Sequence, residues 1–167
     1  MDFYLQRLRD DISTATMGLT PSDLTRHPEG KWSTAEILEH LYLTYTGTTK
    51  GFNRCLEAGK PLARAVSFRD RAKTFVVVGL GYLPGGRTAP KSSVPRGLPT
   101  EVVLAEFSAK LGEMDEVIAR AERQFGERTR VLDHPILGPL RPQEWRKFHW
   151  VHGQHHLKQI RNLRASF

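Results

Sequence analysis

Residues 145–163 read WRKFHWVHGQHHLKQIRNL, and this stretch decides how the rest of the chain is interpreted. On a helical wheel, His149, His152 and His156 fall within about 60° of one another on the apolar side. The opposite side carries Arg146, Lys147, Gln154, Lys158 and Arg161. This pattern predicts an amphipathic helix over about 142–163 whose histidine face points inward.

Two histidines of this face have a spacing that suits metal binding. His152 and His156 are four residues apart, so their imidazoles stack one turn apart on the same side of the helix. His40 is the best candidate for a third ligand, because a helix bundle can bring its helix against the last one. His155 points about 80° away from the centre of the face and is expected to meet solvent or a hydrogen-bond partner. The competing interpretation is a set of satisfied core histidines, but burying unpartnered imidazoles costs on the order of a few kcal/mol each.

The helix that carries His40 has a clear start. Ser33 and Glu36 form a capping-box pattern, in which each side chain can bond the backbone N–H of the other residue. Trp32 and Ile37 are placed to act as a hydrophobic staple across this cap. We therefore expect a helix over about 33–58.

Three further polar residues are candidates for a catalytic role. Glu36 lies one turn before His40 and could orient its ring or act as a base, although capping alone explains it. His149 could support the metal ligands or lie on the surface. Gln159 lies close to one turn beyond His156 and could donate to a bound ligand, or could simply close the bundle.

The whole chain is expected to form a single all-α domain over 1–167. Apolar periodicity predicts four long helices, over 2–17, 33–58, 100–125 and 142–163. Thr100 is expected to cap the third of them. Residues 68–82 fit a short extra helix better than a strand, and residues 84–99 form a long Pro/Gly/Ser connector typical of a crossover. The expected fold is a four-helix bundle with a long crossover and a short extra helix.

Composition narrows the class of protein. The chain has 167 residues, of which 39% are hydrophobic and 26% charged, as in a soluble globular protein. No stretch approaches the roughly 18 apolar residues needed to span a bilayer, and the N-terminus does not resemble a signal peptide. Cys55 is the single cysteine and is expected to be a core residue, so a reducing cytoplasm fits best.

The positive charge is concentrated in one segment. The net charge is +7, and residues 60–97 account for it. This segment holds Lys60, Arg64, Arg69, Arg71, Lys73, Arg87, Lys91 and Arg96 against Asp70 alone. Since no base-reading motif accompanies these cations, we expect a solvated face rather than a specific nucleic-acid site.

Two motifs give the chain a family resemblance. WSTAEILEHL (32–41) and HGQHHLKQI (152–160) resemble the two metal-histidine signatures of the DinB/YfiT-like superfamily. The longer stretch PILGPLRPQEWRKFHWVHGQHHLKQI is similar to an uncharacterised branch of it. The resemblance implies a four-helix bundle with a crossover after the second helix, and it gives the ligand role to His40, His152 and His156. It implies a bound divalent ion, with zinc or nickel favoured and iron or manganese as alternatives. The basic segment has no counterpart that we can identify.

Three functions are compatible with this site. Some characterised members of the superfamily transfer low-molecular-weight thiols, and others are described as metal-dependent hydrolases. An open coordination position could hold water, whose pKa zinc lowers to about 7, or a thiol, which a metal deprotonates. The favoured function is therefore a thiol transferase or hydrolase acting on a small molecule. The alternatives are a non-catalytic metal-binding or stress-response bundle that works through partners, and a nucleic-acid or anion binder that uses residues 60–97. No membrane partner is expected, and a homodimer stays open.

Overall fold

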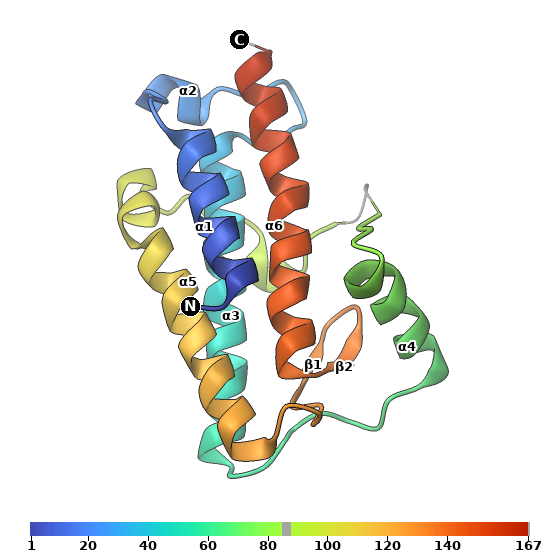
Figure 1. Cartoon of the computed structure of the whole chain (residues 1–167). Helices are drawn as coiled ribbons and strands as arrows, with labels where there is room; N and C mark the ends of the chain where they lie inside the picture. Colours follow the sequence, from blue (N-terminus) through green and yellow to red (C-terminus); the bar gives the residue numbers. More distant parts are fainter. Residues whose placement is uncertain (85–87, 167) are drawn as a thin grey trace.

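The computed structural model describes residues 1–84 and 88–166, and this part of the chain is mostly helical. Four long helices run side by side (Figure 1). They are α1 (Phe3–Thr16), α3 (Thr34–Glu57), α5 (Thr100–Phe125) and α6 (Pro142–Ala165). The sequence-based prediction of a predominantly helical fold is confirmed, and the helix bounds agree within two residues. None of the helices within 1–84 and 88–166 is both long enough and apolar enough to cross a bilayer.

Shorter elements connect the long helices. A short helix, α2 (Pro21–Thr25), follows α1, and α4 (Phe68–Thr74) continues into a π-helical turn, η1 (Phe75–Gly79). Residues 68–79 are therefore helical, as the sequence indicated. Figure 1 shows α4 set apart from the long helices, on the side of the hairpin. Arg87 of the basic segment and its neighbours Gly85 and Gly86 lie outside the described residues.

An antiparallel hairpin precedes α6 and was not predicted. It pairs β1 (Leu132–His134) with β2 (Gly138–Leu140), with Leu132 opposite Leu140. Each strand has three residues, which is too short for the two-residue periodicity that identifies a strand in sequence. The turn depends on Gly138, whose φ of 78° is readily adopted only by glycine.

The start of α5 differs from the sequence-based expectation. Thr100 is the first helical residue rather than the cap, and no side chain caps the helix. The Pro99 carbonyl accepts hydrogen bonds from the N–H groups of Val102 and Val103, both at 3.1 Å, so Pro99 occupies the cap position. In contrast, the capping box of α3 forms as expected between Ser33 and Glu36.

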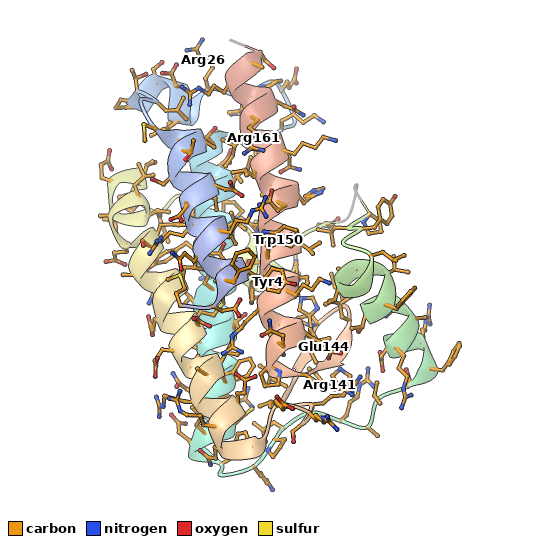
Figure 2. The ribbon with its side chains drawn as sticks, in the orientation of Figure 1. Tyr4, Arg26, Arg141, Glu144, Trp150 and Arg161 are labelled. Carbon is orange, nitrogen blue, oxygen red and sulfur yellow. The ribbon has the colours of Figure 1, made fainter. Side chains whose placement is uncertain are left out.

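The long helices enclose one apolar core. Its largest fully buried members are Leu5, Leu8, Ile37, Leu38, Leu41, Tyr45, Phe52, Leu111, Met114, Ile118, Leu137 and Leu140. Cys55 lies among them with no exposed surface, as expected, and burial raises the pKa of its thiol. Tyr4 of α1 and Trp150 of α6 extend the contact between these helices, with ring centroids 5.6 Å apart (Figure 2). The long helices thus share one continuous apolar core.

Arg146 is buried, although the helical wheel placed it on the outward face of α6. Its exposed fraction is only 6%, and it links α6 to α5. The guanidinium donates from Nε to Asp115 Oδ1 at 2.9 Å and from Nη1 to Glu122 Oε2 at 2.7 Å. A wheel computed for α6 alone contains no information on α5, whose two carboxylates make burial of this cation possible.

We predict that replacing Arg146 with Met lowers the free energy of unfolding by about 3 kcal/mol, because Asp115 stays buried and loses its guanidinium partner. Arg123→Met is the matched control, since Arg123 pairs with Glu116 at 3.3 Å where both side chains are about two-thirds exposed. That change should cost less than about 1 kcal/mol. Urea denaturation of the three proteins measures both values, and equal costs would contradict this account.

Candidate metal centre

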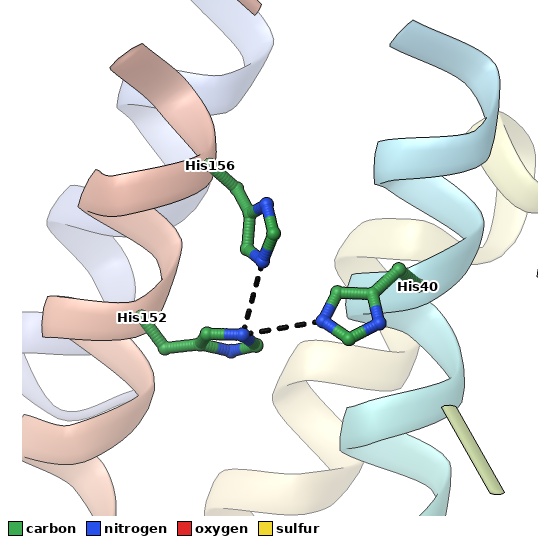
Figure 3. A group of neighbouring side chains, drawn as sticks. All are labelled: His40, His152 and His156. Carbon is green, nitrogen blue, oxygen red and sulfur yellow. Dashed lines mark hydrogen bonds between the residues drawn. The ribbon is translucent and has the colours of Figure 1, made fainter. Parts of the chain in front are cut away.

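The three histidines expected to bind metal meet between α3 and α6. His40 comes from the second turn of α3, and His152 and His156 come from successive turns of α6. The Nε2 atom of His152 lies 3.2 Å from that of His40 and 3.0 Å from that of His156 (Figure 3). One nitrogen from each ring falls within 4.8 Å of the others, so the group could hold a metal ion.

The outer nitrogens of two rings have oxygen partners. The Nδ1–H of His40 donates to the Ser93 carbonyl at 2.7 Å, and the Nδ1–H of His156 donates to Gln159 Oε1 at 2.8 Å. In a neutral imidazole a proton on Nδ1 leaves a lone pair on Nε2. Both rings therefore direct an unprotonated Nε2 at the common centre, which is the tautomer that a metal ligand requires.

The contacts around His152 indicate that the centre suits a cation. Its Nε2 faces the lone pairs of both His40 and His156, but it carries at most one proton and can donate to only one of them. At least one of the two nitrogen–nitrogen contacts is therefore left without a proton between its atoms. Two imidazole nitrogens on a tetrahedral zinc ion lie about 3.3 Å apart, given bonds of about 2.0–2.1 Å. The chemistry and the spacing of these donors therefore fit a shared divalent ion.

Aromatic rings hold the imidazoles in place. Trp32 packs on His40 with ring centroids 5.1 Å apart and on His156 with centroids 6.4 Å apart. Phe148 stacks on His152 at 5.5 Å with an interplanar angle of 12°. The sequence suggested Trp32 only as a staple for the helix start, and the structure shows it also covering two of the three histidines.

A buried carboxylate organises the loop that supplies the Ser93 carbonyl. Glu39 has an exposed fraction of 3%, and its two oxygens accept from the backbone N–H groups of Arg96 at 2.6 Å and Gly97 at 3.1 Å. The short 3-10 helix η2 (Lys91–Ser93) leads into this loop. Glu39 therefore connects α3 to the segment that fixes the tautomer of the adjacent His40. Sequence reasoning missed the Ser93 carbonyl, because any residue could supply a backbone carbonyl. It also missed Glu39, whose partners are backbone N–H groups that no side-chain pattern marks.

A cavity of about 400 Å³ adjoins the three histidines. Apolar and aromatic side chains form much of its wall: Trp32, Leu43, Leu83, Leu132, Ile136, Trp145 and Phe148. A molecule of small-ligand size can thus be held next to the metal-binding group.

The weaker catalytic candidates take different positions. Glu36 accepts the Ser33 N–H at 2.8 Å within the capping box and does not line the cavity, which supports its capping role. Gln159 lines the cavity and fixes the His156 ring rather than only closing the bundle. His149 is fully buried, so it does not lie on the surface, and its Nε2 lies 3.1 Å from Thr48 Oγ1.

Two other histidines lie along the cavity wall. His155 is half-buried and accepts from Gln159 Nε2 at 3.3 Å, in line with the expected hydrogen-bonded position. His134 of the hairpin is buried, and its Nδ1 accepts the N–H groups of Ile136 and Leu137, each at 3.2 Å. Because Nδ1 is an acceptor here, the proton of the neutral His134 ring lies on Nε2.

Burial keeps this group of imidazoles neutral. It lowers the pKa of His156 to about 3, with the nearby His40 adding to the effect. Burial and the neighbouring histidines also hold the pKa of His152 well below its usual value, and burial lowers the pKa of His40. A metal ion would therefore meet unprotonated ligands at neutral pH and well into mildly acidic solution.

The fold and site define a helical protein with a three-histidine candidate metal centre beside a cavity. Comparison with known families adds one assignment. Residues 5–163 match the family described as "Protein of unknown function (DUF1569)", and the chain belongs to this family. It has no significant match among curated proteins or among solved structures.

The depressed histidine pKa values predict acid sensitivity of the metal-free protein. Burial lowers the pKa of His149 to about 3 and that of His134 to about 4, whereas both are about 6.5 in the unfolded chain. Below pH 6.5 the unfolded state binds more protons, so stability falls as pH decreases from 6.5 towards 4. Each buried histidine contributes a slope of up to about 1.4 kcal/mol per pH unit.

Urea denaturation at pH 7, 6 and 5 in the presence of a chelator measures this slope. His149→Phe removes one titrating group and should make the dependence shallower. A free energy of unfolding that stays constant from pH 7 to pH 5 would rule out the neutral, buried state of these rings.

Proposed function

We propose that the protein is a metal-dependent enzyme that binds one divalent ion through His40, His152 and His156. It acts on a small molecule held in the adjoining cavity, by thiol transfer or by hydrolysis. Zinc or nickel is the favoured ion, with iron or manganese as alternatives. The observation that carries the proposal is the convergence of three Nε2 atoms on one point at the edge of a cavity.

Each residue of the site has a defined task in this proposal. Ser93 and Gln159 keep the protons of His40 and His156 on Nδ1, so that Nε2 is free to coordinate. Trp32 and Phe148 restrict the imidazole rings and limit the access of water. When bound, the ion would supply Lewis-acid activation of a coordinated thiol or water. The cavity places the second reactant beside that position.

The number of ligands favours an enzyme over a non-catalytic metal-binding bundle. Structural zinc sites are usually closed by four protein ligands, whereas catalytic sites have three and keep one position for a reactant. Within the described residues, no further histidine, cysteine or carboxylate joins the three histidines as a ligand group. The same three histidines adjoin a cavity, which a purely structural site does not need.

We also infer that the four long helices form a four-helix bundle of the DinB/YfiT-like type. The motif resemblance at 32–41 and 152–160 supports this relationship. So does the placement of the three histidines that it marks as ligands, which come from the expected helices. The long connection between α3 and α5, which includes α4, corresponds to the expected crossover.

Metal analysis of purified variants tests the ligand assignment. The unmodified protein should retain about one divalent ion per chain, and replacing His40, His152 or His156 with Ala should weaken binding by more than about tenfold. His155→Ala is the control, because His155 neighbours the group without contributing a nitrogen to it. Elemental analysis after dialysis, with circular dichroism to verify folding, gives the result.

Three outcomes would contradict the proposal. Stoichiometric metal in the His152→Ala, His156→Ala double variant would show that the ion binds elsewhere. Equal loss of metal from His155→Ala would show that the wrong histidines have been assigned. A metal-loaded protein whose turnover of thiol and ester substrates is unaffected by chelation would refute the enzymatic part.

A further inference from the structure

The helix formed by α4 and η1 carries an apolar stripe on its outer side. Phe68, Ala72 and Phe75 fall within about 60° of one another on a helical wheel. Phe68 is 87% exposed and Phe75 is 63% exposed. Leu80 and Tyr82, which follow η1 in the chain, are 65% and 62% exposed and continue the run of exposed apolar side chains. Single exposed apolar residues are common on protein surfaces, whereas several on one element indicate an interaction site.

The inner side of the same helix is held against the hairpin. Asp70 is buried and accepts hydrogen bonds from Arg64 Nη1 and Ser67 Oγ, both at 2.7 Å. Lys73 Nζ donates to the Ile136 carbonyl at 3.0 Å. Figure 1 shows that α4 stands apart from the long helices. A helix that is anchored on its inner side therefore presents the apolar stripe outward.

Arginines flank the apolar stripe on both sides. On the helical wheel, Arg69 and Arg71 lie within about 60° of opposite edges of the stripe, and both are exposed. The acid between them, Asp70, points inward and binds Arg64. Residues 60–97 as a whole hold eight cations against this one acid. The two arginines and the stripe together form the α4 face, which combines apolar surface with positive charge.

We propose that the α4 face binds the surface of membranes that contain anionic lipids. In an interfacial helix, apolar side chains enter the boundary between headgroups and acyl chains, while flanking cations meet the anionic headgroups. Phe68 and Phe75 in the centre, with Arg69 and Arg71 at the edges, match this arrangement. None of these four residues lines the cavity beside the histidines, so the inference does not depend on the proposed function.

The small size of the α4 face favours a lipid surface over a protein partner. A stable protein interface buries roughly 800 Å² on each partner and uses about 20–30 residues of each. The α4 face offers only a few side chains, even when Leu80 and Tyr82 are included. Binding to a bilayer requires only a small apolar surface and nearby cations. The expectation of no membrane partner rested on the lack of a spanning segment, whereas an interfacial helix lies on the bilayer without crossing it.

Co-sedimentation with unilamellar vesicles tests the inference. One set of vesicles contains phosphatidylcholine alone, and the other contains equal parts of phosphatidylcholine and phosphatidylglycerol. We expect the protein to bind the anionic vesicles at least about tenfold more tightly, because the arginines are attracted to anionic headgroups and not to neutral ones. Added salt should weaken this binding, because it screens the attraction.

A double variant tests the apolar stripe. Replacing both aromatic residues, Phe68→Ser and Phe75→Ser, should weaken binding to anionic vesicles at least about tenfold, because their apolar surface no longer enters the bilayer. The control is the Phe3→Ser, Met17→Ser double variant, at the two ends of α1. These side chains are 70% and 67% exposed, and Figure 1 shows α1 apart from α4, so binding should be unchanged.

A second double variant tests the flanking cations. The changes Arg69→Gln and Arg71→Gln should also weaken binding at least about tenfold. The Arg7→Gln, Arg120→Gln double variant lowers the net charge equally at exposed positions of α1 and α5, which Figure 1 shows apart from α4. It should change binding by less than about twofold. Circular dichroism verifies that each variant is folded.

Three results would overturn the inference. The first is no binding to the anionic vesicles, or equal binding to the two kinds of vesicle. The second is an equal loss of binding in the α4 variants and their controls, which would indicate attraction by net charge or by exposed apolar surface in general. The third is a lipid-free dimer, detected by light scattering, that the Phe68→Ser, Phe75→Ser variant abolishes, which would assign the face to self-association.

Discussion

The meeting of three imidazole nitrogens between α3 and α6 is the constraint around which the site is built. Nitrogens at 3.0 and 3.2 Å cannot all be joined by hydrogen bonds when two of the rings carry their protons on the far side. The structure nevertheless fixes this arrangement from several directions, through the Ser93 carbonyl, the Gln159 amide and two aromatic rings. A divalent cation would relieve the conflict, and coordination by three ligands would leave room for a reactant in the cavity.

The fold separates the groups that give stability from those that give chemistry. Arg146 and its two carboxylates join α6 to α5, whereas the histidines of α6 face α3 and the cavity. The same helix therefore carries a structural ion network and a candidate reactive centre on different sides. Because the apolar core is continuous without the metal, we expect the chain to fold in its absence, unlike a zinc finger.

The sequence predicts the helical class and the central histidines because their signals are local. Apolar periodicity and the Ser33–Glu36 cap depend on neighbouring residues, and the four-residue spacing of His152 and His156 requires only a helix. The features that sequence reasoning missed depend on contacts between distant segments. The burial of Arg146 requires α5, and the tautomer of His40 requires a carbonyl from residue 93, which any amino acid could supply. The hairpin and the cavity likewise arise only when the chain is folded.

Nitrogen NMR of the histidine side chains tests the central claim most directly, because it reports which ring nitrogen carries the proton. In the metal-free protein at pH 7, we expect His40 and His156 to be neutral with the proton on Nδ1 and an unprotonated Nε2. One equivalent of zinc should then shift the Nε2 signals of His40, His152 and His156, with little change at those of His155. Protonated Nε2 atoms on His40 and His156, or a zinc-dependent shift centred on His155, would contradict the account.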